Sequence, residues 1–487
     1  MHSTATPAAR RFHTLMLVLL SGVLAYAVFR AGGVLRRDQY VFLFVLGLLG
    51  SAYSLFAVVN RLPCKVDRAL LWPLILLPAY GALQLVPLPV TLLRLVSPAR
   101  ASLVQALAPV VPGLRFASLS VYPSAGLNRL LVMGGCILIF LLAYQLSVSL
   151  GNQRWAAAAP IVIIAAAEAA LGVAQFSGSG MDGGTGTYGN RNHFAGLLEM
   201  ALPLASMYPI SIWRRAEGRQ PPARAVAAVC AASGAAVLIF LGIICSFSRM
   251  GLIACLGSLA CLSALAFRQG SRRSRRWLVA AALAAASVAG AASLTPIRFI
   301  ERFGKISSKP AAEADLRPQL WRDTSRLIAA YWTVGCGLGA YEPAFTKYKV
   351  VDPSGAYDYA HNDYLQILAE FGVIGSLLVA AFVYAVVTRS FRNLGPQFSP
   401  DPLTAASMAA LAAIMIHSLT DFNLYIPANA MVLAWILGIS TAPLAASASY
   451  SGRASVLPRN WTKDPHAPIH SLRRQMLVCK TAKAQLH

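Results

Sequence analysis

Long apolar runs limit what this chain can fold into more than any other feature of its sequence. About 20 predominantly apolar residues form a helix that can cross a bilayer, and about twelve runs of roughly that length can be marked here. They lie at approximately residues 12–30, 38–59, 69–86, 127–150, 156–176, 193–212, 224–246, 250–267, 277–295, 364–388, 403–420 and 424–445. Hydrophobic residues make up 57% of the 487 positions, more than a soluble protein of this size needs. The strands of a membrane β-barrel would alternate polar and apolar residues over ~10 positions. We therefore expect an all-α polytopic membrane protein with one large outer helical loop.

The polar segments between these runs suggest four parts. Residues 1–295 hold the first nine predicted helices with a loop at 87–126, residues 296–363 form the large loop, residues 364–445 hold the last three helices, and residues 446–487 form a basic tail. Within the loop at 87–126, prolines bound the apolar stretch Leu103–Val111, which predicts an interfacial helix. The first apolar run follows Arg10 and Arg11 but is too long for a signal peptide and lacks a clear cleavage site, so we expect it to be retained.

The net charge of +24 is carried mostly by short loops and the tail. Arg and Lys concentrate on the cytoplasmic side of membrane helices, so we expect both ends of the chain in the cytoplasm. The segment with Arg30, Arg36 and Arg37 is an exception. With an even number of helices and both ends in the cytoplasm, this segment lies outside despite its positive charge. Because membrane topology explains the charges, we expect a lipid bilayer, and no nucleic acid, as a partner. The eight cysteines form neither a CxxC motif nor a cluster with histidine, so we expect no structural zinc and no disulfide pair.

Residues 361–375 combine a polar start with an apolar helix. If this stretch is helical, Asn362, Gln366 and Glu370 lie four residues apart and share one face. Gly372 and Gly375 then interrupt the apolar run where a neighbouring helix can pack closely. A polar stripe is costly at the mouth of a membrane helix, so we expect it to face protein, substrate or water.

Ionisable side chains within the predicted spans gather toward the outer side. Such groups are expensive inside a membrane and are candidates for function. They predict a polar cavity that opens outward, formed by Glu168, Glu199, Glu370, His417, Asp421 and Arg249.

Arginines suggest an anionic ligand at two places. Arg249 lies in a two-helix turn at the outer surface, where its guanidinium can make a bidentate contact with a phosphate or simply extend to the interface. Arg322 and Arg326, together with Arg317, lie on a helix predicted for Leu316–Trp332. These cations suit an anionic partner, or they are neutralised by Glu313 and Asp323 in a solvated charged face.

Two further positions are candidates for acid–base chemistry. His361 lies just above a membrane helix, beside Asn362 and Asp363, and a neutral imidazole there can take a proton from a sugar hydroxyl. A structural hydrogen-bonding role is the alternative. Asp421 is a candidate base, the partner of an arginine, or a turn residue.

The glycine-rich segment 178–193 ends in Asn190-Arg191-Asn192-His193. It is no Walker A loop, because no Gly-Lys-Ser/Thr closes it. We expect a flexible outer loop with a polar helix cap, whose hydroxyl and amide groups can contact a sugar.

These motifs together resemble the O-antigen ligase and polymerase superfamily of bacterial envelopes. The resemblance covers approximately residues 120–445 and also includes the number of spans and the large outer loop. Its landmarks are His361-Asn362 followed by Gly372 and Gly375, the Ser-Arg turn at Arg249, the Trp321-Arg322 helix, Gly337-Leu338-Gly339-Ala340-Tyr341, Gly189-Asn190-Arg191-Asn192-His193-Phe194 and Asp421-Phe422-Asn423.

The resemblance implies an inverting glycosyl transfer at the periplasmic face of the bacterial inner membrane, without metal or other cofactor. The donor is a glycan on undecaprenyl pyrophosphate. The acceptor is lipid A-core in a ligase, another lipid-linked repeat in a polymerase, or a protein side chain in a third branch.

By the same resemblance, Arg249 and Arg322 would hold the pyrophosphate and stabilise its charge as it leaves. His361 would orient or deprotonate the acceptor hydroxyl. Substrate binding is expected of Arg326, Asn362, Asp363, Asn190, Arg191, His193 and Asp421.

We expect ligation to lipid A-core, with polymerisation as the alternative. A glycan or lipid transporter is a third hypothesis, but the sequence offers no convincing pair of Gly/Pro-broken helices in its two halves.

Overall fold

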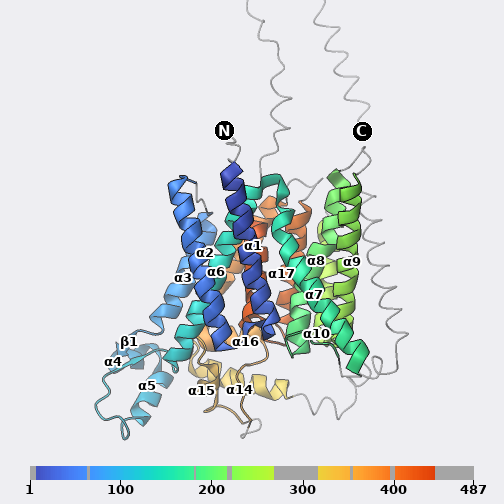
Figure 1. Ribbon diagram of the computed structural model, residues 1–487. Coiled ribbons are helices and arrows are strands. Elements are labelled where there is room, and N and C mark those ends of the chain that lie inside the picture. Colours follow the sequence, from blue (N-terminus) through green and yellow to red (C-terminus); the bar gives the residue numbers. More distant parts are fainter. Residues whose placement is uncertain are drawn as a thin grey trace, which may run out of the picture. The chain divides into compact units, whose positions relative to one another are not determined.

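A computed structural model of the chain describes residues 7–62, 66–179, 183–215, 222–267, 316–350, 355–394 and 401–444. Its long helices run side by side as a bundle, with short helices and two strands at one end (Figure 1). Within the described residues, seven helices are long and apolar enough to cross a membrane: α1 (Pro7–Phe29), α2 (Arg36–Val59), α6 (Pro123–Leu150), α7 (Trp155–Ser179), α8 (Arg191–Arg215), α9 (Ala223–Cys245) and α16 (Asp363–Asn393). Four shorter apolar helices are α3 (Arg68–Leu83), α10 (Arg249–Phe267), α17 (Pro402–His417) and α18 (Pro427–Thr441).

These helices overlap the predicted runs one for one, except for the run at 277–295, which lies outside the described residues. A mostly helical chain with several helices able to cross a membrane is therefore confirmed, whereas the count of about twelve spans stays a prediction.

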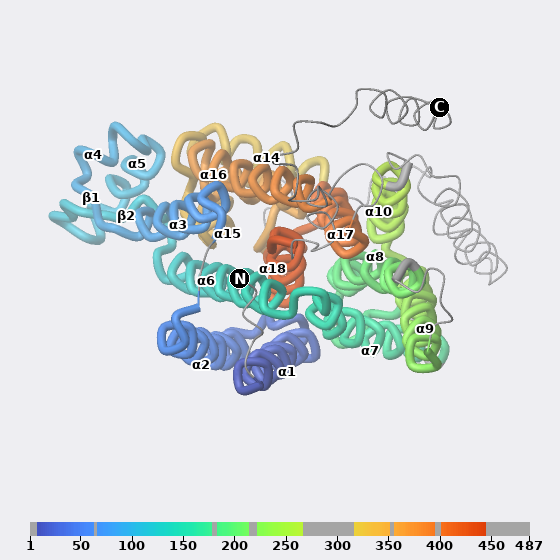
Figure 2. The backbone as a smooth tube through the Cα atoms, turned by 90° about the horizontal axis from the view of Figure 1, so that it is seen from above, coloured from blue at the N-terminus to red at the C-terminus, as the bar shows by residue number. Residues whose placement is uncertain are grey.

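Helix α18 lies in the middle of the bundle, with α6, α8, α16 and α17 around it (Figure 2). Its Trp435 is fully buried, and the indole N–H donates to the carbonyl of Ala157 in α7 at 2.9 Å. A 3₁₀ turn, η4 (Asn423–Tyr425), leads into α18. The side chain of Asn423 lies against Gly196 of α8, where a Cβ atom would be 2.2 Å from Asn423 Oδ1. This close approach fixes the start of α8 beside the connection between α17 and α18.

The segment at 87–126 forms a small module. It contains β1 (Pro87–Pro89), α4 (Val90–Val96), α5 (Pro98–Ala106) and β2 (Phe116–Ser118). The two strands pair antiparallel, with Pro87 opposite Ser118. The helix predicted for Leu103–Val111 is wrong in its bounds, because α5 ends at Ala106. Pro98 suits a first helical turn, whereas Pro109 and Pro112 cannot continue one.

The outer segment before His361 contains α14 (Arg317–Ala330) and α15 (Tyr341–Phe345). Leu320, Leu327 and Tyr331 are buried and form the apolar side of α14 and the residue that follows it. They pack with the stacked rings of Tyr341 and Phe345, whose centroids are 5.0 Å apart. These side chains form a small apolar cluster that also includes Ala369 of α16, so the segment packs onto the end of the bundle.

Helix α16 is broken at Gly372, although the sequence predicts one continuous helix. Gly372 has φ 62° and ψ −170°, a conformation that strongly favours glycine. The loop before α15 fills the break: the N–H groups of Cys336 and Gly337 donate to the carbonyls of Ala369 and Glu370 at 2.9 and 3.1 Å. Gly335 approaches so closely that a Cβ atom would lie 2.1 Å from the carbonyl oxygen of Glu370. Close packing at Gly372 is therefore found, but its partner is a loop.

Gln84, at the C-terminal end of α3, holds this loop to the break. Its buried Nε2 donates to the carbonyls of Val334 (2.8 Å) and Glu370 (3.0 Å), and its Oε1 accepts from the N–H of Leu338 at 3.1 Å. Replacing Gln84 with Leu would leave these buried backbone groups without their partner. We expect a loss of about 2–4 kcal/mol in the free energy of unfolding, measured by thermal unfolding in detergent. Gln319→Leu, at an exposed position of α14, is the control and should change stability little.

Candidate anion and acid–base site

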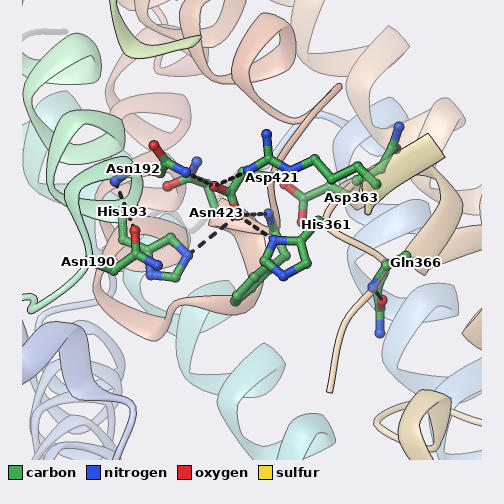
Figure 3. A network of polar contacts seen from close by, with 12 residues as sticks. Asn190, Asn192, His193, His361, Asp363, Gln366, Asp421 and Asn423 are labelled. Carbon is green, nitrogen blue, oxygen red and sulfur yellow. Dashed lines mark hydrogen bonds and ion pairs between the residues drawn. The ribbon is translucent and has the colours of Figure 1, made fainter. Parts of the chain in front are cut away.

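Asp421 is the centre of a polar network at the end of the bundle where α16 begins (Figure 3). Its side chain is 1% exposed. His193 Nε2 and His361 Nδ1 each lie 3.6 Å from Asp421 Oδ1. Asn192 Nδ2 donates to Asp421 Oδ2 at 2.6 Å, and Arg317 Nη2 lies 4.0 Å from the same oxygen. One carboxylate therefore faces two imidazoles, an amide and a guanidinium.

Four segments that are distant in sequence bring these side chains together. Asn192 and His193 belong to the first turn of α8, Arg317 begins α14, and His361 precedes α16. Asp421 itself lies in the loop after α17. The backbone N–H of Asp363 donates to the carbonyls of Ser418 (2.9 Å) and Asp421 (3.1 Å), which ties the start of α16 to that loop. Because the contacts are backbone-mediated, they fix His361 beside Asp421.

Asp421 carries a negative charge in this setting. Burial opposes ionisation, but the contacts with His193 and His361 outweigh burial and hold the pKa of Asp421 well below its usual range. Because the folded-state pKa lies below the unfolded value of about 3.9, ionisation stabilises the folded chain above that pH. This stabilisation is lost only as the pH falls through the lowered pKa. The carboxylate is therefore ionised across the neutral range.

Phe422 sets the orientation of both imidazoles. The ring centroids of His193 and His361 lie 4.7 and 4.8 Å from that of Phe422, both edge-on. On the same ring Tyr359 stacks at 4.1 Å. His361 also has φ 49°, which is uncommon for a residue with a side chain and is often found where function requires it. The sequence analysis treated Phe422 only as part of a motif and missed this role.

A pocket of about 190 Å³ opens next to Asp421, and three arginines line it. Arg191, Arg249 and Arg317 are each the first residue of a helix, α8, α10 and α14 respectively. The N-terminal end of a helix carries a partial positive charge and N–H groups suited to anions. The remaining lining residues are Asn192, Phe247, Met250 and Thr420. A site with three guanidinium groups and three helix N-termini is built for an anion with several oxygens, such as a phosphate or pyrophosphate.

The pocket is coupled to Asp421 through Asn192. The side-chain oxygen of Asn192 accepts from the hydroxyl of Ser248 at 2.9 Å, in the turn just before Arg249. Its amide nitrogen donates to Asp421. The same amide thus connects the arginine-lined pocket with the carboxylate that faces His361.

Comparison with known families agrees with this geometry. Residues 234–380 match the family model described as O-antigen ligase, and the matched segment includes Arg249, Arg317 and His361. This match supports membership of the O-antigen ligase superfamily. None of the curated proteins compared with the chain matches it. The family match implies glycosyltransferase-like activity, and together with the apolar helices it points to a membrane protein. Asn192, His193 and Asp421 lie outside the matched segment, and the structure places Asp421 beside Arg317 and His361 of that segment.

Arg317 lines the arginine-lined pocket, whereas the family resemblance points to Arg322. Arg322 is exposed and is not among the residues that line the pocket. Arg326 is engaged elsewhere, because its Nη1 lies 2.7 Å from Asp323 Oδ1. We therefore move the proposed anion-binding role from Arg322 and Arg326 to Arg317. The sequence predicts this helix, but a choice between its arginines also requires knowing which side of the helix faces the pocket.

Three of the residues predicted to bind substrate make hydrogen bonds within the protein. Asn362 caps α16, because its Oδ1 accepts from the N–H groups of the second and third helical residues at 3.0 and 3.1 Å. Asp363 accepts from the hydroxyl of Ser418 at 2.7 Å. Asn190 Oδ1 accepts from the N–H of Asn192 at 2.9 Å. These side chains build the loop junctions that hold His361, Asp421 and Asn192 in place.

The segment predicted to be a flexible loop is held firmly over its described residues, 183–190. Glu168 accepts from the N–H and the hydroxyl of Thr187 at 3.0 and 2.6 Å. Gln175 Oε1 accepts from the N–H groups of Thr185 and Gly186 at 3.0 and 2.9 Å. The hydroxyl of Thr187 is therefore engaged in a hydrogen bond within the protein. The loop fixes the position of the first residues of α8.

Of the residues predicted to form an outward cavity, Arg249 lines the arginine-lined pocket, and Asp421 lies next to it. The acids within the helices make contacts with other parts of the described chain. Glu168 anchors that loop. Glu370 accepts from Gln366 Nε2 and from the hydroxyl of Tyr425, both at 2.9 Å. Glu199 lies 2.9 Å from His417, and both are fully buried. The acids thus join neighbouring helices, while arginines at helix ends form the pocket.

Proposed function

We propose that this protein transfers a glycan from undecaprenyl pyrophosphate to a sugar hydroxyl at the periplasmic face of the inner membrane, with lipid A-core as the acceptor. The observation that carries the proposal is the pocket lined by Arg191, Arg249 and Arg317 beside the Asp421–His361 pair. One side of the site suits a leaving pyrophosphate, and the other suits the hydroxyl that replaces it. The placement of Arg10, Arg68, Arg154, Arg389 and Arg392 toward the opposite end of the bundle supports this orientation.

The arginines would act on the donor. Pyrophosphate gains negative charge as its bond to the anomeric carbon breaks, and guanidinium groups fixed in advance stabilise that charge. Three helix N-termini add partial positive charge at the same place. No rearrangement of the protein is needed to supply this field, because each arginine starts a helix that is already formed.

His361 would act on the acceptor. Asp421 faces Nδ1, so Nε2 is left to accept the proton of the hydroxyl. The His361 side chain is 37% exposed, which lets an acceptor approach from the periplasm. The separation of 3.6 Å from Asp421 can shorten as positive charge develops on the imidazole.

The step balances as a single displacement. The acceptor oxygen forms a bond to the anomeric carbon while the bond from that carbon to the pyrophosphate oxygen breaks. The hydroxyl proton passes to His361 Nε2, and the electron pair leaves with undecaprenyl pyrophosphate. Attack opposite the leaving group inverts the anomeric configuration.

A polymerase would use the same chemistry with a second lipid-linked glycan as the acceptor. Purified protein in liposomes should be given the lipid-linked donor with and without lipid A-core. Ligation predicts one capped product that requires lipid A-core, whereas a ladder of longer lipid-linked glycans without it would assign polymerisation. Glycan flux across the membrane without bond transfer would assign transport and contradict the proposal.

Transfer should not depend on a divalent metal. Arg191, Arg249 and Arg317 already supply positive charge where a metal ion would otherwise neutralise a pyrophosphate. Extensive treatment with EDTA should change the transfer rate by less than about twofold, because guanidinium groups are not removed by a chelator. The control is the same treatment followed by excess Mg²⁺. A loss on chelation that Mg²⁺ restores would contradict this mechanism.

A further inference from the structure

A second cavity, of about 410 Å³, lies between α3 and α16 and is separate from the arginine-lined pocket. Helix α16 starts beside Asp421, and Arg392, near its other end, lies roughly 40 Å further along at 1.5 Å per residue. The cavity is therefore a groove toward the opposite end of the bundle, and nothing in the proposed glycan transfer uses it.

Small side chains hollow out the groove. Ala381, Ala385 and Thr388 recur along one face of α16, and Ala69 and Pro73 lie on the facing side of α3. Larger apolar side chains form its walls, namely Trp72, Leu76, Leu378 and Tyr384. The volume is within the range of sites that hold small molecules, and the lining is mainly apolar. An acyl chain fits this description.

One end of the groove is charged. Asp67, Arg389 and Arg392 line it there. Asp67 Oδ2 lies 4.0 Å from Arg389 Nη1, and Arg389 Nε donates to the carbonyl of Thr441 at 3.3 Å. These contacts offset one positive charge, so Arg392 and the neighbouring exposed Arg68 leave this end cationic.

Aromatic side chains at this end of the groove indicate that it lies at the level of the lipid headgroups. Trp72 and Tyr384 are 59% and 71% exposed on opposite rims of the groove. Trp and Tyr are enriched at the level of lipid headgroups. Basic pockets between membrane helices at this level bind anionic headgroups.

We propose that the groove between α3 and α16 binds a glycerophospholipid with an anionic headgroup, with an acyl chain along the groove and the phosphate at Arg392. The positive charge of the groove argues for an anionic lipid and against a second copy of the chain. A second copy related by a two-fold axis along the membrane normal would place two Arg392 side chains of like charge close together at the same depth. Undecaprenyl pyrophosphate is not the proposed occupant of the groove, because its pyrophosphate suits the arginine-lined pocket at the other end of the bundle.

Native mass spectrometry of the full chain tests the site. Delipidated protein would be titrated with phosphatidylglycerol or phosphatidylcholine of identical acyl chains. We expect phosphatidylglycerol to occupy the wild type at about five- to tenfold lower concentration, because one basic residue contributes ~1 kcal/mol at a membrane surface. Arg392→Gln should remove this preference. Ala381→Phe, at an exposed position in the groove, should weaken binding of both lipids.

Arg11→Gln is the matched control, because Arg11 is exposed near the start of α1 at the same end of the bundle (Figure 1). It should bind both lipids as the wild type does. Equal binding of the two lipids by the wild type, or equal loss in Arg11→Gln and Arg392→Gln, would overturn the proposal. Displacement of phosphatidylglycerol by undecaprenyl phosphate at equal concentration would assign the groove to the polyprenyl lipid instead. Conversion of a dimer to a monomer by Ala381→Phe would assign it to a second copy.

Discussion

Replacing Asp421 with Asn should lower the rate of glycan transfer by on the order of 10³-fold while leaving the protein folded. The side chains have nearly the same shape, so the variant removes a charge and little volume. Without that charge, the imidazolium that forms on His361 loses its stabilising partner, 3.6 Å away. An amide also presents either an oxygen or an NH₂ group to the imidazoles, so it no longer fixes which nitrogen of His361 carries the proton.

The effect should appear mainly in kcat, since Asp421 is buried behind the arginines that would hold the donor. Steady-state kinetics with purified lipid-linked donor would separate kcat from KM. Asp401→Asn is a matched control, because Asp401 also faces an arginine, Arg154 at 3.5 Å, near the opposite end of the bundle. We expect near wild-type transfer from it. A kcat for Asp421→Asn within about tenfold of the wild type would show that the carboxylate does not assist proton transfer.

The membrane helices could be predicted from the sequence because their signal is local. A run of apolar residues long enough to span a bilayer is visible without knowledge of any partner. The same reasoning failed at Gly372, where the run continues but the helix does not. That break depends on Gly335 and on the hydrogen bonds of Gln84, which are distant in sequence.

The site could be predicted in part. His361, Arg249, Arg191, His193 and Asp421 all carry a residue type that suits the chemistry, and the structure brings them to one end of the bundle. Their pairing could not be predicted, because it depends on how the connections after α17 and before α16 meet. The partners of the acids within the helices could not be predicted for the same reason, since a buried carboxylate that joins two helices looks in sequence like one that lines a cavity.

The helical period and the apolar residues of α14 place Arg317 and Arg322 on different sides of the helix. Five residues along a helix correspond to a rotation of about 140°, so the two side chains leave α14 in different directions. Leu320 and Leu327 are buried and fix the inner side of the helix. Arg317 then lies on the flank beside Asp421, while Arg322 is exposed. The Trp-Arg motif points to Arg322, whereas the position of the buried side favours Arg317.

Arg317→Ala should therefore reduce kcat/KM by about 10²-fold, whereas Arg322→Ala on the same helix should stay within about threefold of the wild type. Each variant removes one arginine from α14, so differences in net charge and helix propensity cancel. Only Arg317 lines the pocket and approaches Asp421. Arg317→Lys should recover part of the loss, because it restores a positive charge but not the planar fork that binds two phosphate oxygens.

Binding of inorganic pyrophosphate, measured by calorimetry, gives a readout that does not depend on turnover. Arg317→Ala should weaken it by about tenfold or more, since a hydrogen bond to a charged group contributes ~1.5–3 kcal/mol, and Arg322→Ala should leave it unchanged. The reverse order in both measurements would return the role to Arg322 and would mean that α14 rotates when the donor binds. A loss in both variants of transfer but not of pyrophosphate binding would place the two arginines on the acceptor side, because the anion pocket would then be complete without them.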